Sequence, residues 1–133
     1  MSKKQGELNQ LRFLLKCYEK GFQVSLPYGD SAKYDCVVDG NGKLYRVQIK
    51  STSYQDKSRR QDRYKIIASG GCDAKKPYTK DDIDILAVYI VPHNTWYLVP
   101  VERLEAHIST YFAPQREGKG KYEPFKEGWE IFE

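Results

Sequence analysis

Residues 34–53 decide the expected fold, and their sequence is YDCVVDGNGKLYRVQIKSTS. Apolar and polar residues alternate on both sides of the segment 39–42, whose Asn-Gly pair is a strong signal for the turn of a β-hairpin. Polar side chains stand in both predicted strands: Asp35 is early in the first, and Gln48 and Lys50 are late in the second. The hairpin therefore carries a carboxylate, an amide and an ammonium group.

These three polar side chains are expected on one face of the hairpin. A turn centred on residues 40 and 41 places Asp35 opposite Arg46. Side chains alternate faces with a period of two, so Arg46, Gln48 and Lys50 share the face of Asp35. Diagonal neighbours across two strands are ~7–8 Å apart, a gap that one six-coordinate ion and its waters can bridge. The other face is apolar and is expected to enter the core; it carries Cys36, Val38, Val47 and Ile49.

The polar set has the parts that metal-assisted phosphodiester hydrolysis needs. Mg²⁺ prefers hard oxygen ligands and keeps several of its waters. Asp35 offers a carboxylate, Gln48 an amide oxygen, and Ile49 a backbone carbonyl. Lys50 can orient or help to deprotonate the attacking water, or stabilise charge on the phosphorus centre. We therefore treat these four residues as a candidate catalytic and metal-binding site.

The same residues resemble the PD-(D/E)XK nuclease superfamily. Asp35 is followed, after a hairpin, by Gln48-x-Lys50, and Glu7 lies upstream in a predicted helix. Residues 6–51 and 78–101 carry the likeness, in the right order and over about half of the chain. It is strongest to small bacterial members that include a group I intron-encoded homing endonuclease from cyanobacteria. Archaeal Holliday-junction resolvases are more distantly similar.

The resemblance implies a restriction-endonuclease-like fold of the α/β (α+β) class, in which helices flank a mixed central sheet. It also implies DNA cleavage with Mg²⁺, for which Mn²⁺ can substitute. It assigns Asp35 to the metal-binding aspartate and Lys50 to the catalytic lysine. Glu7 corresponds to the helical glutamate that holds a metal directly or through water. The sequence departs from the family pattern at Tyr34, where Pro is common, and at Gln48, which replaces Asp or Glu. A neutral ligand holds Mg²⁺ less tightly, so the second departure implies a tuned site.

Plainer interpretations compete with these assignments. The spacing of Asp35, Gln48 and Lys50 alone fits a solvated polar face of an antiparallel hairpin, which is common. Glu7 also suits the first turn of a helix, where it complements the dipole. Three carboxylates at residues 81, 82 and 84 are interpreted as a turn or helix cap followed by the start of a strand, in preference to a second metal site. The matching flanks and the basic central segment favour the nuclease.

The rest of the chain predicts one domain, residues 1–133, with a helix before the hairpin and strands after it. Residues 6–22 have apolar side chains at 8, 11, 15, 18 and 22, the spacing of one helical face. Strands are expected at 22–28, with Pro27 at an edge, at 63–69, at 84–92 and at 96–101. The strand at 84–92 is almost wholly apolar, as in a strand buried on both faces. A second helix is expected at 102–112, and a last strand or extended tail at 125–133.

The charge distribution points to a polyanionic partner. Residues 43–80 hold eleven Lys or Arg and three Asp, a net charge of +8, whereas the rest of the chain carries −4. Cations mixed with tyrosines suit phosphate contacts in double-stranded DNA, although a solvated basic loop is the alternative. The predicted DNA-binding residues are Arg46, Tyr54, Arg59, Arg60, Arg63, Tyr64, Lys65, Lys75, Lys76 and Tyr78, with Lys119 and Lys121 as weaker candidates.

These observations together predict a Mg²⁺-dependent, sequence-specific homing-type DNA endonuclease. One site per chain cuts one strand, so double-strand cleavage predicts a homo-oligomer, dimer or tetramer, on a pseudo-palindromic target. A junction resolvase and a non-catalytic DNA-binding relative are the alternatives. The N-terminal residues have no signal-peptide pattern, no apolar run is long enough to cross a membrane, and three dispersed cysteines fit reduced thiols. A cytoplasmic, nucleoid-associated prokaryotic protein is expected.

Overall fold

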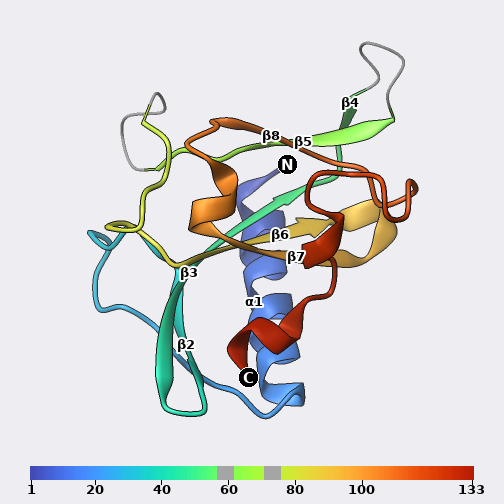
Figure 1. Ribbon diagram of the computed structural model, residues 1–133. Coiled ribbons are helices and arrows are strands. Elements are labelled where there is room, and N and C mark those ends of the chain that lie inside the picture. The colour runs from blue at the N-terminus through green and yellow to red at the C-terminus, as the bar shows by residue number, and fades with distance from the viewer. Residues whose placement is uncertain (57–61, 71–75) are drawn as a thin grey trace.

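The computed structural model describes residues 1–56, 62–70 and 76–133. A five-stranded mixed sheet, in the order β1-β2-β3-β6-β7, lies between the helix α1 and a three-stranded sheet, in the order β4-β5-β8 (Figure 1). The elements are α1 Lys3–Glu19, β1 Gln23–Ser25, β2 Cys36–Gly40, β3 Lys43–Thr52, β4 Gln55–Asp56, β5 Arg63–Ile67, β6 Ile85–Ile90, β7 Thr95–Pro100 and β8 Ser109–Phe112, with short 3-10 helices η2 Val91–His93, η3 Val101–Leu104, η4 Glu123–Phe125 and η5 Trp129–Phe132. This arrangement confirms the predicted fold class.

The hairpin of β2 and β3 is confirmed, but its expected register is wrong by two. The turn is at Asn41-Gly42, where both residues have positive φ, 54° and 85°, as a tight hairpin turn with the right-handed twist requires. Gly40 pairs with Lys43 and Val37 pairs with Arg46. Asp35 therefore lies at the level of Gln48, closer to it than the sequence suggested. Because the error is an even number of residues, the set of residues on each face is unchanged.

Two apolar cores lie on the two sides of the central sheet. Val47 and Ile49 of β3 pack with Phe13 of α1 in one core. Leu86 and Val88 of β6 pack with β5 and β8 in the other. Every residue of β6 is buried, as predicted, because this strand has a covered surface on each side. The buried thiols of Cys17 and Cys36 belong to the first core, and burial raises the pKa of Cys17 to about 12. The two thiols are small core residues, as expected.

The helix forms where predicted but buries a different face. A capping box between Ser2 and Gln5 starts α1, and Gly21, with φ 86°, follows its end. The buried positions are Asn9, Phe13 and Cys17. The predicted apolar face is wrong, since Leu8, Leu11, Leu15 and Tyr18 are all exposed. Asn9 can be buried because its amide donates a hydrogen bond to the Ser51 hydroxyl at 3.0 Å.

Two expectations for the C-terminal third are also wrong. Residues 102–112 form η3 and β8 instead of a helix, because Glu105 and Ala106 have φ of 52° and 59°, which no α-helix accommodates. Strand β8 then pairs with β5. Residues 125–133 form 3-10 turns instead of a strand, and they place Trp129 and Phe132 in the core beside α1. In the described parts of the chain, no helix has the length and apolar character needed to cross a bilayer.

Candidate active site

Asp35 is held at the entrance of the hairpin by two backbone contacts. Its N–H donates to the carbonyl of Val47 at 2.8 Å, and its carboxylate oxygen Oδ2 accepts the N–H of Ile49 at 2.8 Å. The side chain thus crosses from β2 to β3 and is fixed beside the segment that carries Gln48 and Lys50. Cys36, the next residue, points into the core beside α1, so alternation along the strand turns Asp35 to the opposite face of the sheet.

Gln48 and Lys50 lie on the same face of the central sheet as Asp35. In the parallel pairing of β3 with β6, Gln48 is beside Leu86 and Lys50 is beside Val88. Both β6 neighbours belong to the core under the small sheet, whereas α1 covers the other face. The structure therefore brings Asp35, Gln48 and Lys50 together on the side of the small sheet, each half-buried.

Partial burial sets the electrostatics of this group. Desolvation raises the pKa of the Asp35 carboxyl above its ordinary value, although the Ile49 N–H and the charge of Lys50 act in the opposite direction. Desolvation likewise lowers the pKa of the Lys50 ammonium, and the nearby Asp35 opposes that change. Burial thus favours the neutral form of both groups, and pKa values perturbed in this way are common among catalytic groups.

Tyr78 lies next to this group and is buried in the core of the small sheet. Burial, with smaller contributions from Asp35 and Asp82, raises the pKa of Tyr78 to about 12, so its phenol keeps its proton. Its ring also packs directly against the backbone of Gly70, where an added Cβ would come within 2.5 Å of the ring. Tyr78 is therefore a buried, neutral core residue near Asp35.

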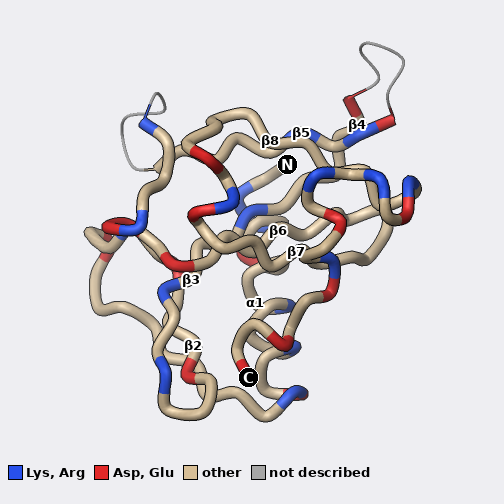
Figure 2. The backbone as a smooth tube through the Cα atoms, viewed as in Figure 1, with Lys and Arg blue, Asp and Glu red and all other residues tan. Residues whose placement is uncertain are grey.

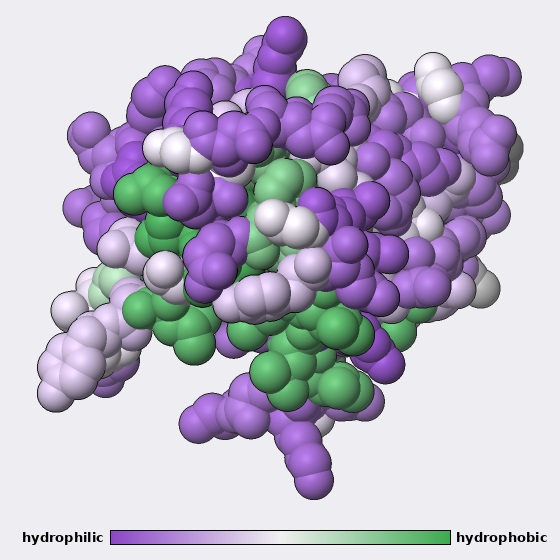
Figure 3. All heavy atoms as spheres, turned by 90° about the horizontal axis from the view of Figure 1, so that it is seen from below, coloured by the Kyte–Doolittle hydropathy of each residue, from purple (hydrophilic) through white to green (hydrophobic). Residues whose placement is uncertain are grey.

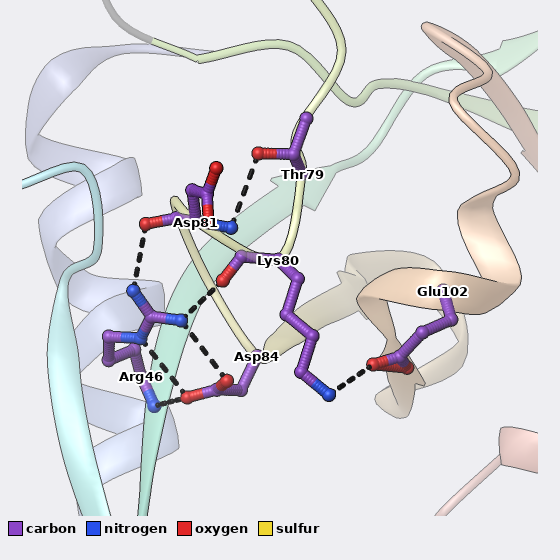
Figure 4. Close-up of polar contacts among 6 residues, drawn as sticks. All are labelled: Arg46, Thr79, Lys80, Asp81, Asp84 and Glu102. Atoms are coloured by element: carbon purple, nitrogen blue, oxygen red, sulfur yellow. Dashed lines mark hydrogen bonds and ion pairs between the residues drawn. The ribbon is translucent and has the colours of Figure 1, made fainter.

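Arg46 faces the same side of β3 but is fully engaged within the protein (Figure 4). Its Nε donates to Asp84 Oδ2 and its Nη2 to Asp84 Oδ1, both at 3.2 Å. The guanidinium also donates to the carbonyls of Lys80 at 2.5 Å and Asp81 at 2.9 Å. The backbone of Arg46 donates to Asp84 as well, at 2.8 Å. Arg46 thus fixes the segment before β6 against β3, and its expected contact with DNA stays a prediction.

The neighbouring carboxylates complete this structural clamp. Burial acts to raise the pKa of Asp84, but its hydrogen bonds with Arg46 hold it below the ordinary value. Asp82 accepts the N–H of Thr79 at 3.0 Å and the Lys33 ammonium at 2.9 Å. The expected turn followed by a strand is thus confirmed. Within the described residues, no group of three His, Cys, Asp or Glu is placed to hold a metal.

The donor atoms around Asp35 are of the kind that Mg²⁺ prefers. One carboxylate, the Gln48 amide oxygen and the Ile49 carbonyl are all hard oxygen donors, and Mg²⁺ commonly takes few protein ligands and several waters. The Ile49 N–H bond holds the carboxylate in one orientation. These residues therefore fit a hard divalent cation. Glu7 is exposed and lines a surface groove of α1 with Leu8 and Leu11, and its expected metal contact stays a prediction.

Apart from Arg46 and Arg63, the predicted DNA-binding residues divide into three groups. Tyr64 and Tyr78 are corrected to core residues, because the alternation of β5 and the packing on Gly70 turn their rings inward. Tyr54, Lys65 and Lys76 are exposed, as a DNA contact requires. Arg59, Arg60 and Lys75 lie outside the described residues.

Arg63 belongs to a basic cavity that the sequence only partly indicated. Its guanidinium lies 3.7 Å from the centre of the Tyr111 ring, and both line a cavity of about 410 Å³. The loop after β8 contributes Arg116, Lys119 and Lys121. In Figure 2 this loop and β5 bring their Lys and Arg residues to the side of the small sheet. The Lys-Gly-Lys pattern at 119–121 signalled part of this surface, but nothing in the sequence linked it to Arg63.

A sequence model of the PD-(D/E)XK endonuclease family matches residues 1–131. The chain belongs to the PD-(D/E)XK endonuclease family.

A comparison of structures agrees with this fold. The chain is similar to the solved structure of a bacterial homing endonuclease, I-Ssp6803I, with a TM-score of 0.77 and 23% sequence identity. The match covers 98% of this chain and 93% of that chain. A search of curated proteins found no significant match.

Proposed function

We propose that this protein is a Mg²⁺-dependent, homing-type DNA endonuclease that acts as a single domain in the cytoplasm, and that Mn²⁺ can replace Mg²⁺. The observation that carries the proposal is the group of Asp35, Gln48 and Lys50 on one face of the central sheet, with the Asp35 carboxylate fixed by the Ile49 N–H at 2.8 Å. Membership of an endonuclease family and the likeness to a homing endonuclease support the choice of DNA as substrate.

Each residue has a separate role in the proposed reaction. Asp35, the Gln48 amide oxygen and the Ile49 carbonyl would hold the ion, which when bound supplies positive charge that polarises the scissile phosphate. Lys50 orients the attacking water and accepts or relays its proton, which its lowered pKa favours. The water oxygen forms the new bond to phosphorus as the bond between phosphorus and the leaving deoxyribose oxygen breaks, and a proton from solvent completes the released hydroxyl.

Exposed cations around the site provide the DNA contacts in this proposal. Lys65 of β5, Lys76 and the exposed ring of Tyr54 are suited to phosphate and groove contacts. The basic cavity at Arg63 adds contacts farther along the duplex. Binding through several phosphates is expected to weaken steeply as salt increases. Because one chain offers one such site, cleavage of both strands needs at least two copies on a pseudo-palindromic target.

A cleavage assay tests the proposal. Wild type and Asp35→Ala are incubated with linear duplex libraries and with four-way junctions, in Mg²⁺, Mn²⁺ or EDTA. We expect wild type to cut a linear site in Mg²⁺ or Mn²⁺ and to be inactive in EDTA. Asp35→Ala is expected to be inactive in all three conditions. Cutting of junctions of unrelated sequence would instead indicate a resolvase. Salt-sensitive DNA binding without cleavage in either metal would contradict the proposal and indicate a DNA-binding relative, for which Gln48 would be the reason.

A further inference from the structure

The outer face of α1 is an apolar surface that the fold leaves uncovered. Leu8 is 46% exposed, Leu11 and Leu15 are each 61% exposed, and Tyr18 is 55% exposed. We call these four residues the α1 stripe. Figure 3, which views the molecule from below, shows apolar residues gathered on part of a surface that is otherwise polar. Single exposed leucines are ordinary, but four large apolar side chains on one helical face indicate an interaction site.

The spacing of the stripe is that of a helix-pairing seam. Its residues are separated by three, four and three positions, the pattern of alternating a and d positions in a two-helix coiled coil. Phe13 lies between them in sequence but points the other way, into the protein's own core. A second helix can therefore pack on the stripe without disturbing the contacts that hold α1 to the central sheet.

We propose that the α1 stripe pairs with the α1 stripe of a second copy of this chain. In the part of the chain that the structure describes, α1 is the one α-helix, so a second copy is the source of a helix with the same spacing. A two-fold pairing of identical stripes is self-complementary. This inference rests on the proposed function for its purpose, because the pairing would bring two strand-cutting sites into one particle.

The charges at the ends of α1 favour an antiparallel pair. Lys4 continues the seam one turn before Leu8, and Glu19 is the last residue of the helix. In a parallel pair, Lys4 would meet the same lysine of the other copy. In an antiparallel pair that sets Leu8 against Tyr18 and Leu11 against Leu15, each Lys4 lies just beyond the last turn of the other helix, at the negative end of its dipole.

The surface beside the stripe also suits this arrangement. A groove of about 710 Å³ lies along the N-terminal half of α1 and is lined by Ser2, Lys4, Gln5, Glu7, Leu8 and Leu11. Antiparallel pairing delivers the exposed ring of Tyr18 from the other copy to this groove. One helix pair buries less than the ~800 Å² per partner of a standard interface, so we expect dissociation in the micromolar range.

Sedimentation of the full chain tests the pairing. We expect wild type to change from monomer to dimer as its concentration rises to ~100 μM, and Leu11→Lys to weaken the dimer by at least ~10-fold. The matched control is Leu44→Lys, because Leu44 is 64% exposed but belongs to β3. Circular dichroism and thermal melting verify that both variants fold. A wild type that stays monomeric, or a control that weakens the dimer equally, would overturn the proposal.

A charge reversal tests the orientation. Lys4→Glu is expected to weaken the dimer severalfold, because it brings a negative charge to the negative end of the other helix, whereas a parallel pair would lose a repulsion between the two copies of Lys4. Strengthening by Lys4→Glu alone would overturn the antiparallel arrangement. The outcome is separable from that of the proposed function. A dimer without metal-dependent cleavage would refute the nuclease and leave the pairing intact, whereas a monomer that nicks DNA would refute the pairing alone.

Discussion

Arg46 and Lys50 lie four residues apart on the same face of β3, and each is near a carboxylate from another segment, Asp84 for Arg46 and Asp35 for Lys50. The two charge pairs differ in how their charges are satisfied. Arg46 and Asp84 exchange several hydrogen bonds, and these hold the pKa of Asp84 low against its burial and raise that of Arg46. Asp35 and Lys50 are more deeply buried, and burial shifts both toward neutrality. The first pair is built to stay charged and hold two segments together. In the proposed function, the second pair binds the ion and exchanges a proton.

The largest expected difference between the two pairs is in cleavage. Asp35→Asn keeps an oxygen acceptor for the Ile49 N–H but removes the charge from the proposed ligand. We expect it to lower the DNA cleavage rate by ~100-fold or more while leaving the melting temperature near that of wild type. Asp84→Asn should instead keep cleavage within severalfold at a temperature where it is folded. The comparison fails if Asp84→Asn loses cleavage while folded and Asp35→Asn does not.

The second difference is in stability. Arg46→Ala removes three side-chain donors from Asp84 and the carbonyls at residues 80 and 81, so we expect it to lower the free energy of unfolding by about 2 kcal/mol. Urea denaturation followed by circular dichroism measures this loss. Lys50→Ala breaks no comparable set of hydrogen bonds among the described residues, so it should lower the free energy of unfolding much less. Equal losses in the two variants would show that the pairs do not differ in structural role.

A smaller effect is expected at the amide that departs from the family pattern. Gln48→Glu adds a negative charge at the proposed ion, so we expect Mn²⁺ to bind about 10-fold more tightly, as measured by calorimetry. Gln48→Leu, a variant of similar size without a ligand oxygen, is the control and should bind Mn²⁺ more weakly. No change in Mn²⁺ affinity in either variant would remove Gln48 from the ligand set.

The smallest effect concerns protonation within the active pair. The charge of Lys50 acts to lower the pKa of Asp35, so Lys50→Ala should raise that pKa further. Because the carboxylate must be ionised to hold an ion, metal binding should then be lost at a higher pH during acidification. Carboxyl NMR titration of the metal-free protein measures the pKa, with Lys43→Ala on the same strand as the control. A shift of equal size in the control would show that the two charges are not coupled.

The sequence could predict the face of the candidate site but not the partners of its charges. Period-two alternation places Asp35, Gln48 and Lys50 together even though the predicted turn was off, because an even register error leaves the faces unchanged. The role of Arg46 could not be predicted, since Asp84 is 38 residues away and is brought near by the parallel pairing of β3 with β6.

The helix shows the limit of the apolar pattern. Periodicity located α1, but the most regular apolar stripe is the exposed face, and the buried face includes the polar Asn9. A regular apolar spacing predicts a helix, but it does not tell which face of that helix packs against its own chain. The helix expected at 102–112 failed for a different reason, since the left-handed backbone at Glu105 and Ala106 has no strong signal in those residue types.

In the proposed mechanism, Lys50 acts in the chemistry, whereas Lys43 of the same strand does not. The most direct test is single-turnover DNA cleavage in Mg²⁺ by wild type, Lys50→Ala and Lys43→Ala, with DNA affinity measured in Ca²⁺ or in EDTA. We expect Lys50→Ala to cut at least ~100-fold more slowly with nearly unchanged affinity, and Lys43→Ala to cut as wild type does. Cleavage by Lys50→Ala at the wild-type rate would contradict the account.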